Sequence, residues 1–194
     1  MELEKARAIA EELKNQLQGS CHMIEIVGDI RRQKPRVGKI KLLCIPAPVK
    51  GEPLPAEYRD LSSSLSSQDW LPEFDDDDAV HQRVMQLMQE EVLDFTPKGT
   101  RAYSVTKKSI LHVPSSIAVD IVSTDAQCWA VALVVATGGA KTNRRIAGAA
   151  RGKGWRFRAS GSGFDTPDGH ITCSTEQEVF EAVGLPYLPP EERV

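Results

Sequence analysis

The chain has 194 residues, which suits one domain or a small two-lobed unit. Apolar residues make up 41% of it, enough for a sizeable core, and the net charge of −3 excludes a uniformly basic surface. No apolar run reaches the ~18 residues that cross a bilayer, so we expect no membrane partner, and any nucleic-acid-binding face has to be local.

Hydrophobic spacing predicts a first helix followed by two strands. Apolar residues recur at helical spacing across residues 3–18, and Gly19 supplies a stop signal. Apolar and β-branched residues predict strands at 22–27 and 37–45, the second closed by Pro46.

The composition changes across residues 47–78, which are rich in proline and serine and end in the four aspartates 75–78. This composition indicates a flexible loop or insertion. A helix is predicted for residues 79–93, and we interpret the aspartates as its solvated N-terminus, where negative charge is favourable.

The second half of the chain is predicted to contain three short strands, at 101–106, 109–113 and 117–123. An apolar segment at 126–136 and a basic helix at 140–153 follow. Strands and helices in this mixed order are typical of an α+β protein.

The last part of the chain is expected to hold a hairpin and a capped helix. Residues 155–159 and 170–172 are predicted to pair across a glycine-rich turn. A helix is expected at 175–183, where Thr175 and Glu178 have the spacing of a capping box.

The cysteines indicate a reduced, cytoplasmic setting. They are scattered, without a Cys-x-x-Cys pair, at Cys21, Cys44, Cys128 and Cys173. The pattern therefore suggests neither a disulfide framework nor a zinc site.

The most informative stretch reads Gly28-Asp29-Ile30-Arg31-Arg32, then five residues, then Gly38-Lys39-Ile40-Lys41. Without a gap, it resembles the nucleotidyltransferase signature of family X DNA polymerases, Gly-Ser-x-Arg-Arg followed by Gly-Asp-x-Asp. The resemblance implies that Gly28, Asp29 and Arg32 lie at the triphosphate-binding turn. It also implies that positions 39 and 41 share one face of a strand, where the family has two metal-binding aspartates.

Two later segments extend the resemblance. Asp120, in a neighbouring predicted strand, matches the third carboxylate of the family. Seventeen residues further on, Thr137-Gly138-Gly139 resembles the Tyr-Phe-Thr-Gly-Ser element that faces the nucleotide sugar.

The basic helix and the C-terminal tail fit the same family. Asn143 and Arg144 match positions near the nucleotide and the template, and residues 175–193 resemble the family's tail. We expect a DNA-binding face formed by Arg144, Arg145, Arg151 and Lys153.

The resemblance implies a nucleotidyltransferase palm with a mixed sheet and flanking helices over residues 1–136. A small C-terminal subdomain of helices and a hairpin is expected over 137–194.

The departures from the family all fall at the proposed site. Asp29 replaces a serine, Lys39 and Lys41 replace two aspartates, and Val135-Ala136 replaces Tyr-Phe. Carboxylate oxygens suit the magnesium ions that the family uses, whereas an ammonium group has donors and no free lone pair. We therefore predict no metal cofactor and a site closed by internal ion pairs.

Three functional interpretations stay open. The favoured one is a pseudoenzyme that binds gapped or primer–template DNA with impaired or lost nucleotidyl transfer. A deoxynucleoside triphosphate is a second ligand, weakened because Asp29 lies at the triphosphate turn. The alternatives are an active gap-filling nucleotidyltransferase that recruits other carboxylates, such as Glu25 or residues 75–78, and a protein-interaction module on the same fold.

Overall fold

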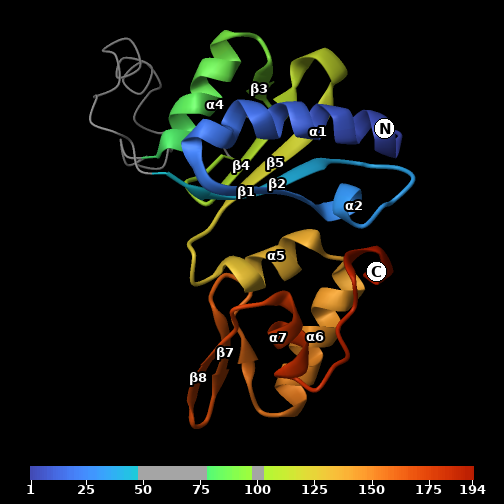
Figure 1. The fold of residues 1–194 in the computed structure, drawn as a ribbon, viewed down its shortest axis with the longest axis vertical. Coiled ribbons are helices and arrows are strands. Elements are labelled where there is room, and N and C mark those ends of the chain that lie inside the picture. Colours follow the sequence, from blue (N-terminus) through green and yellow to red (C-terminus); the bar gives the residue numbers. More distant parts are fainter. Residues whose placement is uncertain (48–77, 98–102) are drawn as a thin grey trace.

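The computed structural model describes residues 1–47, 78–97 and 103–194. The chain forms a larger lobe built on a mixed sheet and a smaller lobe of helices and a second sheet, joined through one apolar helix (Figure 1). The α+β class is thus confirmed. In the described residues no helix is long and apolar enough to cross a membrane.

The larger lobe contains a five-stranded sheet in the order β1-β2-β5-β4-β3. Its strands are β1 Cys21–Val27, β2 Ile40–Pro46, β3 Leu93–Phe95, β4 Lys107–His112 and β5 Ile117–Ser123. β2 and β5 run parallel, and the other neighbours pair antiparallel. The central strand β5 therefore lies between β2 and β4, which positions side chains of three strands side by side.

Helices α1 (Leu3–Leu17) and α4 (Ala79–Gln89) lie together over one face of this sheet (Figure 1). Their apolar stripes pack on alternate residues of the strands. The main core contains Ala10, Leu13, Leu17, Ile40, Leu42, Val84, Leu87, Val119 and Ile121. The opposite face of the sheet points toward the smaller lobe.

The smaller lobe is built from α5 Trp129–Thr137, α6 Ala140–Gly152, α7 Glu176–Glu181 and the strands β6 Arg156–Phe157, β7 Gly163–Thr166 and β8 Gly169–Thr172. Its core combines Val131 and Val134 of α5 with Ile146, Phe164 and Phe180. Helix α5 also packs against β1 and β2, so it connects the two cores. The proposed boundary after residue 136 stays a prediction.

Short elements complete the fold. Helix α2 (Gly28–Arg31) is a single turn directly after β1. The 3-10 turns are η1 Gln18–Ser20, η3 Val113–Ser115 and η4 Pro190–Glu192. None of these was expected from hydrophobic spacing, because each is too short to show a period.

Most elements occur where the sequence predicts them, with three differences. Helix α4 ends at Gln89, before the predicted residue 93, because Glu91 adopts a positive φ of 57° and the chain then enters β3. The strand predicted at 101–106 is wrong for its described part: residues 103–106 form a turn closed by the Ser104 amide and the Lys107 carbonyl. Residues 48–77, with most of the predicted flexible insertion, lie outside the described residues.

The third difference concerns the hairpin. The segment near 155–159 does not pair with 170–172; β7 lies between β6 and β8 and pairs with both. The predicted turn thus contains a strand. Gly163 permits this, since a Cβ there would lie 1.9 Å from the Ile171 carbonyl oxygen.

The predicted cap of the last helix is present in a shifted form. The Thr175 hydroxyl accepts a hydrogen bond from the Glu178 amide at 3.2 Å. The Glu178 carboxylate accepts from the Ser174 amide at 2.7 Å, one residue before the cap. Helix α7 therefore begins at a fixed point, which places Glu176 in its first turn.

Two glycine substitutions test this packing. Gly163→Ala should destabilise the fold by about 2 kcal/mol or more, because the new methyl meets backbone rather than a movable side chain. Gly148→Ala is the matched control: it lies inside α6 with open space around it and should stabilise by about 0.5–1 kcal/mol. Urea denaturation of both variants gives the free energies, and equal stability of the two would contradict the described β7–β8 pairing.

Candidate functional site

The site that the signature predicts lies on the sheet face opposite α1 and α4, around Asp120 of β5. In the register of the sheet, Asp120 lies opposite Lys41 of β2 and opposite Ser109 of β4. Lys39 directly precedes β2 and shares the face of Lys41, while Lys107 shares the face of Ser109. The predicted residues 39, 41 and 120 are thus brought together.

Both oxygens of the Asp120 carboxylate have partners. The Ser109 hydroxyl donates to Oδ1 at 2.6 Å, and Nζ of Lys39 lies 3.0 Å from Oδ2. Nζ of Lys107 lies 3.3 Å from the same Oδ2. Burial would raise the pKa of Asp120, but the Ser109 hydroxyl, Lys39 and Lys107 outweigh it and hold that pKa below its usual range.

These residues do not fit a magnesium ion. A divalent ion needs several oxygen ligands, but the centre offers one carboxylate that is only 4% exposed and already paired. Three ammonium groups and one carboxylate sum to about +2, which repels a cation. Among the described residues, no group of three or more acidic, histidine or cysteine side chains could hold a metal.

Lys41 lies between the turn at Gly28 and the Asp120 centre. Its aliphatic stem packs on Gly28, where a Cβ would lie 3.0 Å from the Lys41 Cδ. Gly28 also has a positive φ of 68°. Glycine is therefore favoured here both by the backbone conformation and by the close approach of Lys41. No carboxylate of the described residues lies within ion-pair distance of the Lys41 ammonium.

The other carboxylates considered from sequence lie elsewhere. Glu25 of β1 is 51% exposed and pairs with Lys14 at 3.5 Å. Asp78 is buried against Lys108 at 2.6 Å, and Lys108 alternates with Ser109, so Asp78 lies on the opposite sheet face from Asp120. Residues 75–77 lie outside the described residues.

The predicted triphosphate turn is closed by an ion pair. Asp29 and Arg32 are in direct contact, and the Gly38 amide also reaches the Asp29 carboxylate at 3.5 Å. A second nitrogen of Arg32 donates to the Arg193 carbonyl at 3.4 Å. Arg32, the residue expected to hold a triphosphate, is therefore engaged by the protein itself.

The C-terminal residues lie against the predicted sugar-facing glycines. A Cβ at Gly139 would lie 2.3 Å from a nitrogen of Arg32 and 2.4 Å from the carbonyl carbon of Val194. The Val194 carbonyl accepts from the Thr142 amide at 2.8 Å, in the first turn of α6. This close approach gives a reason for glycine at position 139, where the family has serine.

The remaining nucleotide candidates are also engaged in internal contacts. The Thr137 hydroxyl accepts a hydrogen bond from Arg31 at 2.7 Å. A Cβ placed on Gly138 would lie 3.8 Å from a guanidinium nitrogen of Arg32. The Asn143 amide donates to the Val135 carbonyl at 3.0 Å. The structure thus gathers the predicted residues of the triphosphate turn and glycine element at one place, where they contact one another.

An ion-pair network that the sequence did not indicate joins the two lobes. Arg31 makes two hydrogen bonds to Glu176, at 2.7 and 2.8 Å, and the fully buried Arg193 donates to Glu176 at 2.7 Å. Burial would raise the pKa of Glu176, but the two arginines outweigh it and hold that pKa below its usual range. Phe180 and Tyr187 lie beside the Arg193 guanidinium.

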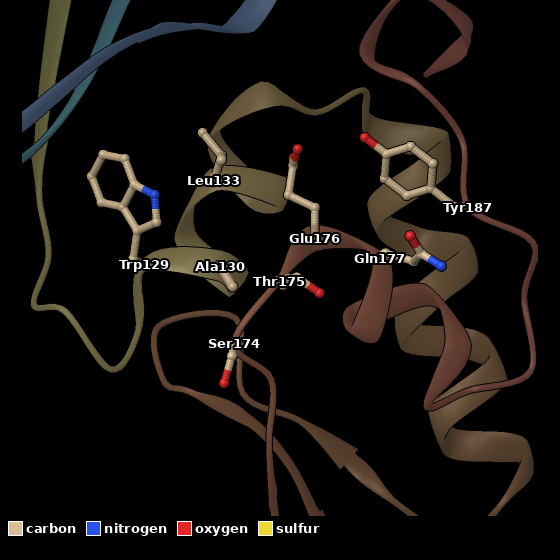
Figure 2. A pocket seen from close by; sticks show the side chains of 8 residues that line it. All are labelled: Trp129, Ala130, Leu133, Ser174, Thr175, Glu176, Gln177 and Tyr187. Atoms are coloured by element: carbon tan, nitrogen blue, oxygen red, sulfur yellow. The ribbon is translucent and has the colours of Figure 1, made fainter.

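A cavity of about 420 Å³ lies beside this network and away from Asp120. Figure 2 shows its lining: Trp129, Ala130, Leu133, Ser174, Thr175, Glu176, Gln177 and Tyr187. Glu176 is the charged residue among them, and both of its oxygens already accept hydrogen bonds from arginines. The cavity therefore offers no uncompensated charge to a ligand.

The predicted basic face follows helix α6. This helix carries four basic residues and no acidic one, and Arg144, Arg145 and Arg151 are exposed on it. Lys153 differs, because its ammonium donates to the Ala182 carbonyl at 2.8 Å and lies 4.7 Å from the centroid of the Trp155 ring. All four predicted side chains are thus exposed, and the ammonium of Lys153 is engaged by the Ala182 carbonyl.

The chain is similar to known proteins in its fold and in the sequence of its C-terminal part. Residues 132–194 match the family model of the DNA polymerase beta thumb. Two solved structures of polymerase beta from Leishmania infantum, a ternary P/T complex and a ternary gap complex, each superpose with a TM-score of 0.69 at 19% identity. They cover the whole of this chain and 76% and 70% of their own chains. Among curated proteins, none matches.

These findings define the fold: the chain has a polymerase beta-like fold over its whole length. The likeness extends to the sequence over residues 132–194, which match the polymerase beta thumb.

Glu176→Gln tests the network between the lobes. The substitution leaves the fully buried Arg193 without a counter-charge, so stability at pH 7 should fall by about 3 kcal/mol. The pKa of Glu176 is lower in the folded than in the unfolded state. Its carboxylate therefore contributes its full stabilisation of the folded state above the unfolded-state pKa of about 4.3, and this stabilisation is lost as the pH falls through the folded-state pKa. The difference between wild type and variant should therefore shrink below about pH 4.3.

The measurement is urea denaturation across pH, with exposed Glu11→Gln on α1 as the matched control. A loss for Glu176→Gln no larger than that of the control, or a loss that stays constant down to pH 2, would count against the network.

Proposed function

We propose that this protein binds DNA through the α6 face and does not carry out metal-dependent nucleotidyl transfer. The observation that carries the proposal is the Asp120 carboxylate, both of whose oxygens are already used by Ser109, Lys39 and Lys107. A two-metal reaction needs free carboxylates to hold ions between the attacking and leaving oxygens. This centre has none to offer among its described residues.

The DNA partner is supported by charge and by similarity. Arg144, Arg145 and Arg151 lie exposed on one acid-free helix, and arginines bind backbone phosphates strongly. The matched family model is the polymerase beta thumb, and the two similar structures are described as primer–template and gap complexes of their own protein. We therefore propose gapped or primer–template DNA as the ligand.

Nucleotide binding is expected to be weak. Arg32 would have to leave Asp29 and the Arg193 carbonyl before it could hold a triphosphate. Separating a partly buried ion pair removes a favourable interaction and leaves Asp29 beside the ligand's negative charge. A deoxynucleoside triphosphate is thus a secondary ligand in this proposal.

A reduced compartment, the cytoplasm, completes the proposal. All four cysteines are free thiols, and Cys21, Cys44 and Cys173 are buried. Free buried thiols are typical of proteins that function under reducing conditions.

The test is binding of gapped DNA in EDTA and in magnesium, together with primer extension. Wild type should bind equally in both, extend nothing, and lose affinity with salt by a log–log slope of about −0.9 per phosphate contact. Arg144→Glu with Arg145→Glu should weaken binding and reduce the slope by about 0.9 for each lost contact.

The matched control combines Lys5→Glu, Ala8→Glu and Asn15→Asp at exposed positions of α1, which changes the net charge by the same four units away from α6. Equal affinity of the two variants would contradict the α6 face. Extension of the primer would instead favour an active nucleotidyltransferase. If the protein neither binds DNA nor extends the primer, the result would favour a protein-interaction module.

A further inference from the structure

We propose that Lys39, Lys41 and Lys107 form a metal-free phosphate-binding site around Asp120, and that its ligand is a phosphate group of a DNA strand. This inference rests on the proposed DNA binding and names the second contact that the palm makes with the same ligand. It assigns a role to Lys107, which the signature does not contain.

The three lysines flank β5 on both sides and lie on the same face of the sheet. Lys39 directly precedes β2, Lys41 is the second residue of β2, and Lys107 begins β4 on the other flank of β5. Nζ of Lys39 and Nζ of Lys107 meet at a single oxygen of Asp120, at 3.0 and 3.3 Å. The ammonium groups of Lys39 and Lys107 are thus held close together, and Lys41 lies directly opposite Asp120 in the register of the sheet.

The charges at this place do not cancel. Three ammonium groups share one carboxylate, which leaves about two positive charges that no described residue compensates. The nearby Asp29 is neutralised by Arg32, and Glu25 pairs with Lys14. An anion that enters therefore meets an attractive field rather than a repelling carboxylate.

The exposure of the side chains allows a ligand to reach them. Lys39 is 39% exposed and Lys107 is 51% exposed, whereas Asp120 is only 4% exposed beneath them. The lysines can turn their ammonium groups outward while the carboxylate stays fixed by Ser109. Ammonium groups bind phosphate oxygens as compact point charges, so the site needs no divalent ion.

A strand phosphate is favoured over a nucleotide triphosphate. The arginine that would grip a triphosphate is Arg32, and it is engaged by Asp29 and by the Arg193 carbonyl. A single phosphate group requires only the lysines. The basic residues of α6 supply further contacts to the same strand, because the sheet face and α6 belong to lobes that α5 connects.

The experiment uses the full chain, EDTA and gapped DNA, with Lys41→Gln, Lys107→Gln and Asp120→Asn compared with Lys5→Gln on the exposed side of α1. Each site lysine variant should weaken binding by about threefold to fivefold and reduce the salt slope by about 0.9. Asp120→Asn should tighten binding, because it removes the carboxylate that competes with the phosphate. If Asp120 instead held a metal ion that bridges to the DNA, Asp120→Asn would weaken DNA binding.

Two competitors identify the source of the phosphate. Inorganic phosphate should displace DNA from wild type at a lower concentration than from Lys41→Gln. dATP should displace DNA more effectively than inorganic phosphate only to the extent that its larger negative charge predicts. Displacement by dATP at a far lower concentration than by inorganic phosphate would overturn the strand phosphate in favour of a triphosphate.

The outcomes separate this inference from the proposed function. No DNA binding by wild type would overturn the proposed function. Binding that depends on Arg144 and Arg145, but is the same for Lys41→Gln, Lys107→Gln and Lys5→Gln, would overturn the lysine site alone. If Asp120→Asn fails to fold, which circular dichroism reveals, the two lysine variants still decide.

Discussion

A single carboxylate, that of Asp120, determines what this site can do. It carries one negative charge at the centre of the sheet, and Lys39, Lys107 and Ser109 already share it. Burial would raise the pKa of Asp120, but the Ser109 hydrogen bond and the ion pairs lower it and keep the carboxylate ionised. An ionised Asp120 in turn makes the neighbouring lysines tolerable. The centre is therefore stable without a metal, and the same arrangement leaves positive charge that a phosphate can use.

The surroundings of the site are consistent with this change. Asp29 neutralises Arg32, and the tail at Val194 fills the space beside Gly139 that a serine would need. Glu176 and its two arginines join the lobes, and the fold of the whole chain is similar to that of polymerase beta, while Lys39 and Lys41 stand where the signature has aspartates. The framework is held by the two hydrophobic cores and the Glu176 network, so the fold by itself does not fix an activity.

The sequence predicts most of the fold and the centre of the site. Long periodic segments such as α1 are clear from spacing, and the signature places residues 39, 41 and 120 together. Lys107 was missed because the strand was predicted to begin at 109, and pairing register cannot be read from one chain. The Glu176 network was missed because its partners are far apart in sequence and their contact depends on how the lobes pack. The sequence predicts a turn where β7 lies, because β7 has only four residues and Gly163, with the neighbouring Gly161 and Gly169, is typical of a turn.

Manganese binding tests the central claim most directly, namely that the metal site is replaced by lysine–carboxylate pairing. Electron paramagnetic resonance titration of the full chain with Mn²⁺ should show no saturable site in wild type. Lys39→Asp with Lys41→Asp and Asp29→Ser restores carboxylates beside Asp120 and should create one, accompanied by a higher melting temperature in the metal. A saturable Mn²⁺ site in wild type that disappears in Asp120→Asn would contradict the account.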